Sequence, residues 1–400
     1  MKVALVHDWL VGMRGGERVV EAFCELFPDA DLHTLVHLKG ACSPVIERMR
    51  IRTSFVDRLP FARERYRSLL PLFPHAIEAF DLTGYDLVLS SSHCVAKGVI
   101  VPTSAVHVSY VHTPMRYLWD QYPEYFGPGR AGLATRAAMR VCSTFLRTWD
   151  EASANRVDLF VANSFNVASR IEKRYRREAQ VVHPPVDVAR FQMRGERAVE
   201  DFYLMVTAFA PYKKIEVALQ AFKQCGRRLK VVGWGQEWKR MKALAGGSVE
   251  LLGPLTDPEV ADLYPRCKAL IFPGEEDAGI TPLEAQAAGR PVIALARGGA
   301  LETVVGLDPL GWEPSASLPP GEAREPTGLF FDEPTVPALL AAVDRFERSL
   351  DRFDPAAARR NAERFDRRHF KARIAAIVER ALAGRDLSRH PAGDAPSAVH

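Results

Sequence analysis

Short apolar runs alternate along this chain with longer segments whose apolar residues recur at helical spacing. The short runs are typical of strands buried inside a parallel sheet, and the longer segments are typical of the helices that cover its faces. In the first half of the chain, this pattern predicts strands over residues 3–6, 32–36, 87–89, 106–111, 159–162 and 181–182. The alternation of strand and helix indicates an α/β fold built from βαβ units.

The pattern stops near residue 183 and restarts after a polar stretch, 194–201, which we interpret as an interdomain linker. Beyond it, strands are predicted over residues 203–206, 229–232, 249–252, 270–272 and 292–294. The sequence therefore predicts an N-terminal domain over 1–193, a C-terminal domain over 202–365, a final helix over 366–383 that packs back on the N-terminal domain, and a disordered tail over 384–400. Two such domains leave a cleft between them, and open parallel sheets bind ligands at the carboxyl ends of their strands.

Composition narrows the classes of protein that fit. A length of 400 residues with 47% hydrophobic content allows two or three domains with cores of their own. The net charge of +4 is small for this length and does not favour nucleic acid as a partner. The six cysteines include no C-x-x-C pair, which favours free thiols in a reducing compartment over structural zinc. The first eight residues form a buried-strand pattern and not a signal peptide, and no apolar run approaches the roughly 18 residues of a membrane span.

Two glutamates eight positions apart, Glu276 and Glu284, stand where a predicted strand gives way to a helix. The strand ends at Phe272, a loop containing Gly279 follows, and small residues continue the helix. Such a loop presents free backbone N–H groups and the positive end of a helix dipole to a phosphate. Carboxylates accept hydrogen bonds from the hydroxyls of a sugar or a ribose. The arrangement therefore suits a nucleotide sugar, and the alternative is a solvated loop followed by an ordinary helix.

The segment from Phe272 to Ile293 resembles the signature of the retaining family 4 glycosyltransferases, and it is most similar to bacterial mannosyltransferases of O-antigen and exopolysaccharide assembly. The resemblance implies a GT-B fold, in which two Rossmann-like domains face a central cleft. It implies retaining transfer of a hexose, with GDP-mannose as the best donor, to a glycan or polyprenyl-diphosphate-linked acceptor in surface polysaccharide synthesis. The resemblance implies that Glu276 is a catalytic residue that binds the transferred sugar and that Glu284 binds the ribose. It implies that Gly279, Ile280 and Thr281 bind the remainder of the donor.

Two loops of the N-terminal domain are candidate parts of the same site. Gly15 and Gly16 follow the first predicted strand, where glycines let the backbone approach a diphosphate, and a plain tight turn is the alternative. His112 follows a buried strand, and a structural histidine is the alternative to a catalytic one. The resemblance implies that the glycine pair closes over the donor phosphates and that His112 lies beside the transferred sugar. Arg116 is a candidate for binding the acceptor or a phosphate.

The loops of the C-terminal domain add cations and further glycines. The resemblance makes Lys213 a catalytic residue that neutralises the donor diphosphate, and a solvated surface lysine is the alternative. Ala208 departs from the family, which usually carries an arginine there, and this removes one expected bidentate partner of the phosphates. Lys214 and Arg297 are the cations nearest in sequence that could replace it. The second glycine loop of the family corresponds to Gly298 and Gly299.

The sequence contains no Asp-x-Asp motif at the end of a predicted strand, where such a motif would hold a divalent ion. We therefore expect neither a metal nor another cofactor, and we expect backbone amides, helix N-termini and a lysine to stabilise the leaving nucleoside diphosphate. Three alternatives stay open. They are a UDP-sugar-dependent transferase of the same fold, another GT-B enzyme such as an epimerase or phosphorylase, and a nucleotide-sugar-binding module without turnover.

Arginines gather in the segment 48–67, at positions 48, 50, 52, 58, 63, 65 and 67, between aromatic and aliphatic residues. Such a surface suits an anionic membrane or a lipid diphosphate acceptor, and an ordinary arginine-rich helix face is the alternative. A second candidate is the helix that carries Arg130, Arg136, Arg140 and Arg147. We expect a cytoplasmic protein that is peripheral on the inner face of the membrane.

Overall fold

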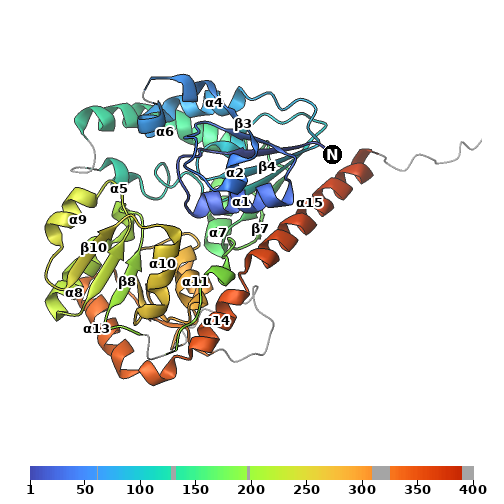
Figure 1. The fold of residues 1–400 in the computed structure, drawn as a ribbon. Coiled ribbons are helices and arrows are strands. Elements are labelled where there is room, and N and C mark those ends of the chain that lie inside the picture. The colour runs from blue at the N-terminus through green and yellow to red at the C-terminus, as the bar shows by residue number, and fades with distance from the viewer. Residues whose placement is uncertain (61, 128–131, 196–198, 309–324, 390–400) are drawn as a thin grey trace, which may run out of the picture.

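Two parallel sheets, one in each half of the chain, organise the protein (Figure 1). The computed structural model describes residues 1–60, 62–127, 132–195, 199–308 and 325–389. Helices cover both faces of each sheet, because the strands between them carry apolar side chains on both sides. The prediction of an α/β fold with two parallel-sheet domains is confirmed.

The N-terminal sheet has seven strands in the order β3-β2-β1-β4-β5-β6-β7. The strands are β1 (Val3–His7), β2 (Asp31–Thr34), β3 (Arg50–Thr53), β4 (Leu87–Ser92), β5 (Val106–Val111), β6 (Leu159–Ala162) and β7 (Ala179–Val181). Every residue of β1, β4 and β5 is buried, including the serines at the end of β4 and His107 and Ser109 of β5. The prediction missed β3, because this edge strand is Arg-Ile-Arg-Thr and only Ile51 offers an apolar signal.

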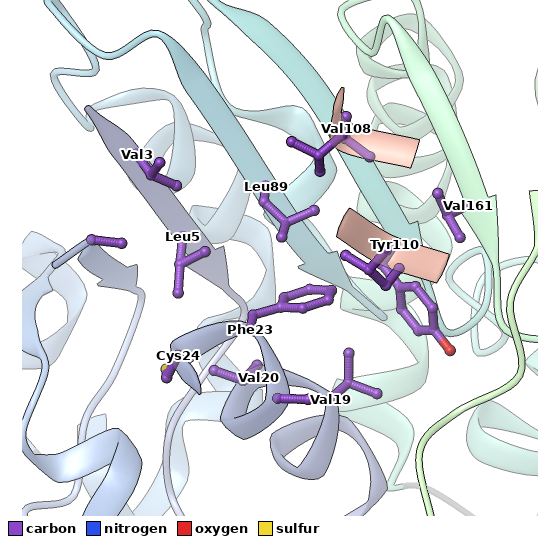
Figure 2. Packing of buried hydrophobic residues seen from close by; sticks show 14 of the residues in the cluster. Val3, Leu5, Val19, Val20, Phe23, Cys24, Leu89, Val108, Tyr110 and Val161 are labelled. Carbon is purple, nitrogen blue, oxygen red and sulfur yellow. The ribbon is translucent and has the colours of Figure 1, made fainter. Parts of the chain in front are cut away.

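Helix α1 shows how the core of this domain is built. The helices of the domain are α1 (Gly15–Leu26), α2 (Pro44–Glu47), α3 (Ala62–Arg65), α4 (Phe73–Glu78), α5 (Tyr122–Phe126), α6 (Leu133–Ala154) and α7 (Phe165–Tyr175). Figure 2 shows Val19, Val20 and Phe23 of α1 pointing at the sheet, toward Leu5 and Tyr110. Because these side chains are at most 1% exposed, α1 is held in a fixed position against the strands of the sheet.

The C-terminal sheet has six strands in the order β10-β9-β8-β11-β12-β13. The strands are β8 (Tyr203–Val206), β9 (Leu229–Val232), β10 (Val249–Gly253), β11 (Leu270–Phe272), β12 (Val292–Leu295) and β13 (Gly328–Phe331). The helices are α8 (Ile215–Cys225), α9 (Trp238–Leu244), α10 (Asp257–Leu263), α11 (Ile280–Ala287), α12 (Ala300–Thr303) and α13 (Val336–Arg348). The prediction missed β13, an edge strand that begins with Gly328 and leaves only three apolar residues as a signal.

The chain crosses between the domains twice, and the two crossings are hydrogen-bonded to each other. The Val186 N–H donates to the Phe365 carbonyl at 3.0 Å, and the Arg367 N–H donates to the Val186 carbonyl at 3.0 Å. Two helices flank the second crossing, α14 (Pro355–Glu363) and α15 (Arg367–Arg389). α14 packs on α11 of the C-terminal domain, whereas α15 places Phe370 and Ile374 in the core beside α1 (Figure 1).

Helix α15 is longer than the sequence predicts. It runs to Arg389, six residues past the predicted end at 383, so the first part of the predicted tail over 384–400 is helical. The remainder of that prediction, 390–400, lies outside the described residues. None of the helices in the described ranges is long and apolar enough to cross a bilayer.

Candidate functional site

Loops that follow strands of the two sheets meet between the N-terminal and C-terminal domains (Figure 1). Gly15, the first residue of α1, lies so close to Ile280, the first residue of α11, that a Cβ on the glycine would be 3.0 Å from Ile280 Cδ1. Gly16 lies beside two histidines, with its Cβ position 3.7 Å from His112 Nε2. The predicted glycine loop therefore touches both the predicted donor helix and the predicted histidine.

Backbone crowding explains the glycines that follow β11 and β12. Gly298 has a φ of +62°, and a Cβ at this position would collide with the Glu276 carbonyl oxygen. The Gly299 N–H donates to the same carbonyl at 2.8 Å, so the two loops are fused into one surface. Gly279 has a φ of +67° and starts α11, which leaves the amides of Ile280 and Thr281 at the positive end of the helix.

Lys213 and Glu276 form an ion pair at the centre of this surface. Lys213 is 9% exposed and the Glu276 side chain is 19% exposed, so the pair is largely withdrawn from water. Burial opposes the charge of the lysine, but the attraction of Glu276 outweighs it and raises the pKa of Lys213. Of the alternatives for Lys213, a solvated surface lysine is thus wrong.

Arginines from the N-terminal domain reach across the cleft to Asp277. Arg116 forms an ion pair with Asp277 Oδ2, and Arg170 Nη1 of α7 lies 2.5 Å from Asp277 Oδ1. Arg116 also lies over the ring of Tyr212, with 4.9 Å from its Cζ to the ring centroid, and therefore next to Lys213. The sequence prediction included Arg116 but missed Arg170 and Asp277, because a contact over 107 positions leaves no local pattern.

Glu284 lies one to two turns along α11 and faces a small cavity between the domains. Tyr264 donates its hydroxyl hydrogen to Glu284 Oε2 at 2.7 Å. The pocket has a volume of about 130 Å³ and is lined by Arg18, Arg190 and Ile280, among others. Burial raises the pKa of Glu284, while the tyrosine and the nearby arginines oppose this shift. The two predicted glutamates thus address different parts of the cleft.

His112 belongs to a histidine cluster under the Gly16 loop. Its Nε2 lies 2.8 Å from Ser91 Oγ, and its ring is 6.1 Å from that of His93. Burial, followed by the repulsion of His93, His7 and Arg116, lowers the pKa of His112 well below its usual value. The neutral ring can accept or donate a hydrogen bond, but it cannot supply a fixed positive charge.

Glu302 ties the second glycine loop to the N-terminal domain. Its carboxylate accepts hydrogen bonds from the Phe165 and Asn166 amides, at 2.8 and 2.9 Å, and lies 2.9 Å from His183 Nε2. A side chain of the C-terminal domain thus caps α7 of the other domain. The sequence alone gives no signal for this role of Glu302, because the helix that it caps lies 137 positions away.

The two cations proposed to replace an arginine at Ala208 are placed differently. Lys214 Nζ lies 3.3 Å from Glu124 Oε1 of α5, at the rim of the cleft. Arg297 is exposed, and no ion pair of its side chain is seen in the described ranges. Neither lies against the Lys213–Glu276 pair as Arg116 does, since Arg116 acts electrostatically on both Lys213 and Glu276. Within the residues that the structure describes, no cluster of three or more histidine, cysteine or carboxylate groups could hold a metal ion.

Two glycosyltransferase family models match the chain. Residues 13–190 match Glycosyltransferase Family 4, and residues 190–352 match Glycosyl transferases group 1. An uncharacterized glycosyltransferase of Methanocaldococcus jannaschii is 26% identical over 153 residues, 37% of this chain and 43% of that protein. The alpha-1,3/1,6-mannosyltransferase ALG2 of Mus musculus is 23% identical over 192 residues, 39% of this chain and 46% of that protein. The chain spans less than half of the length of these curated relatives.

Among solved structures, Anabaena HepE in complex with UDP is similar over most of the chain. The TM-score is 0.64 at 16% identity, and the match covers 95% of this chain and 100% of that chain. The two parallel sheets and structural neighbours of this kind establish the GT-B fold, as the sequence predicts. The family models and the relatives together support a transferase.

The interdomain cluster predicts that Asp277→Asn destabilises the protein far more than Glu275→Gln. Asp277 is 6% exposed and receives two arginines, so its loss removes the ion pair of the largely buried Arg116 and the shortest ion pair of Arg170, at a cost of about 3–5 kcal/mol. Glu275 is the matched control, since its side chain is 42% exposed and its single contact with Arg170 is 3.4 Å long. Urea unfolding of both variants measures the difference. Equal losses of stability would show that the arginines do not depend on Asp277.

Proposed function

We propose that this protein is a retaining, metal-independent glycosyltransferase that moves a hexose from a nucleotide sugar to a glycan or lipid-linked glycan acceptor. The observation that carries the proposal is the Lys213–Glu276 pair, placed where the start of α11, both glycine loops and Arg116 converge. Phosphate oxygens suit the amides, the lysine and the arginine, and sugar hydroxyls suit the carboxylate. Glu284, farther along α11, is then the partner of the ribose.

The proposed reaction breaks the bond between the anomeric carbon and the donor phosphate and forms a bond from that carbon to an acceptor oxygen. The acceptor hydroxyl attacks on the face that the phosphate leaves, so the anomeric configuration is retained. Its proton passes to the leaving phosphate oxygen. Lys213, Arg116 and the amides of Ile280 and Thr281 stabilise the charge that develops on the nucleoside diphosphate. His112, neutral and beside Gly16, hydrogen-bonds the transferred sugar.

Mannose from GDP-mannose is the donor that we favour, because the segment 272–293 resembles bacterial mannosyltransferases and the mouse relative is named a mannosyltransferase. A UDP-sugar is the second candidate, supported by the UDP in the similar Anabaena structure. A nucleotide-sugar-binding module without turnover is the third, and it rests on the alanine at position 208. The proposed setting is surface polysaccharide synthesis in the cytoplasm, at the inner face of the membrane.

Nucleotide binding separates these candidates. Calorimetry with GDP, UDP and ADP should show GDP binding most tightly, followed by release of GDP from GDP-mannose in the presence of a membrane lipid extract. Lys213→Met should weaken GDP about tenfold or more, since a hydrogen bond to a charged group contributes about 1.5–3 kcal/mol, and should leave guanosine binding unchanged. Preference for UDP would overturn the mannose assignment but keep the fold. Binding of GDP without release of product would favour the binding module.

Glu276→Ala should abolish transfer and leave the protein folded, at a lower stability because the largely buried Lys213 loses its partner. The carboxylate is lost from the sugar side of the cleft, and loss of one group aimed at the transition state lowers kcat by about 100-fold or more. Glu333→Ala is the control, because Glu333 is an exposed residue of the C-terminal domain that lies far along the chain from Glu276. Product formation is measured by mass spectrometry, and circular dichroism checks the fold. A Glu276→Ala enzyme with near-full activity would refute the assignment of the site.

Chelation tests the proposed absence of a metal. Because Lys213, Arg116 and a helix N-terminus supply the positive field, EDTA should leave the rate of transfer unchanged. The rate is compared before and after dialysis against EDTA, and again after Mg²⁺ or Mn²⁺ is added back. Loss of activity that either ion restores would contradict the mechanism and leave the glycosyltransferase fold untouched.

A further inference from the structure

Helix α6 has a second apolar face that the described protein leaves uncovered. One face packs in the core, where Met139, Leu146 and Trp149 are at most 9% exposed and share a cluster with Tyr66 and Phe73. The opposite face carries three of the most exposed large apolar side chains of the protein. They are Leu133 at 80%, Val141 at 78% and Phe145 at 57% exposure.

These side chains form one stripe. Positions 134, 137, 138, 141 and 145 recur at helical spacing, so exposed alanines join Val141 and Phe145 on a single face. The stripe of α6 is defined here by Leu133, Ala134, Ala137, Ala138, Val141 and Phe145. The helix has 22 residues, which corresponds to about 33 Å, and it lies on the outer side of the N-terminal domain, away from the C-terminal domain (Figure 1). Contiguous exposed apolar surface of this kind marks an interaction site.

A row of arginines borders the stripe. Arg136, Arg140 and Arg147 lie at spacings of four and seven on one flank, and no acidic residue occurs between positions 133 and 149. Within the described ranges, no partner of the Arg136 or Arg140 side chain is seen. Arg147 Nε donates to the Leu118 carbonyl at 2.8 Å, so this third arginine is anchored at the base of the row. Arg130 lies outside the described residues.

We propose that α6 docks this protein on the surface of an anionic phospholipid bilayer. The stripe enters the boundary between headgroups and acyl chains, and the arginines contact lipid phosphates. Charge complementarity selects this occupant, because no partner of the Arg136 or Arg140 side chain is seen in the described ranges and the acidic residues of α6, Asp150 and Glu151, come only near its C-terminal end. A second copy that docked by the same helix would cover the stripe, but it would bring more arginines than acids, since Glu151 is the exposed acid of α6.

The arginine-rich segment 48–67 fits this role less well than α6. Arg50 Nε lies 2.9 Å from Asp31 and Arg63 Nη2 lies 3.2 Å from Asp57, so part of the charge is neutralised within the protein. Its apolar side chains Val56 and Tyr66 are buried in the core. The docking surface is therefore α6, which lies apart from the cleft and does not depend on the donor or on sugar transfer.

Vesicle co-sedimentation of the full chain tests the apolar stripe. The wild type should bind vesicles of phosphatidylcholine with phosphatidylglycerol and should bind pure phosphatidylcholine vesicles much less. Val141→Ser combined with Phe145→Ser should lower the partition coefficient at least about tenfold, since it removes two inserting side chains. Leu350→Ser is the control, because Leu350 is 50% exposed on the C-terminal domain. Unchanged binding of the double variant would overturn the proposal.

A charge-reversal pair tests the arginine row. Arg136→Glu with Arg140→Glu should lower binding to anionic vesicles about 25-fold or more, since each basic residue contributes roughly fivefold near an anionic surface, and 0.5 M salt should weaken the wild type likewise. Arg228→Glu with Arg348→Glu, both exposed on the C-terminal domain, is the control and should bind as the wild type does.

The same preparations distinguish the other outcomes. GDP binding in solution should be retained by all α6 variants, so a failure of docking and a failure of the proposed transfer are separable. Circular dichroism and melting temperature show whether each variant is folded. If the wild type binds neither kind of vesicle, the proposal is wrong. If it instead forms a dimer by analytical ultracentrifugation that Val141→Ser with Phe145→Ser abolishes, the occupant of the stripe is a second copy.

Discussion

The cleft of this protein depends on the mutual neutralisation of charges that the two domains place against each other. Arg116 and Arg170 come from the N-terminal domain, whereas Asp277, which pairs with both, comes from the C-terminal domain. A buried charge without its partner costs several kcal/mol, so the domains can bury these side chains between them only because each charge meets a partner of opposite sign. Lys213 and Glu276 likewise neutralise each other, and both belong to the C-terminal domain. The site is thus strongly polar but electrically balanced.

A diphosphate ligand would change this balance in a way that suits the proposed chemistry. Its negative charge competes with Glu276 for Lys213, which already carries a raised pKa and stays protonated. Once the lysine turns to the phosphates, the Glu276 carboxylate is released to accept hydrogen bonds from a sugar hydroxyl. The glycines keep the position of the carboxylate fixed during this exchange, because Gly298 and Gly299 hold the Glu276 backbone on the neighbouring loop. The Lys213–Glu276 ion pair therefore neutralises both charges when no ligand is bound, and it makes both side chains available to a ligand that binds.

The sequence predicts those elements of the protein whose formation depends on residues that are neighbours in the chain. Central strands such as β1 are buried on both faces and appear as apolar runs, whereas the edge strands β3 and β13 lack a long run of this kind and were missed. In the site, the glycine loops and Lys213 follow strands, and the resemblance of the sequence to a known family singled them out as candidates. Asp277 and Glu302 were not assigned roles, because their partners lie over 100 positions away and only the domain arrangement brings them together.

The alanine at position 208 illustrates how such long-range contacts shape function. No cation stands at this position of the β8 loop, and Lys214 is turned toward Glu124 at the cleft rim. Arg116, stacked on Tyr212, is the cation that accompanies Lys213, and it belongs to the other domain. If the diphosphate needs both Lys213 and Arg116, as we propose, the C-terminal domain alone supplies only one of the two cations. Binding of the donor is then coupled to apposition of the domains, which also excludes water from the reacting carbon.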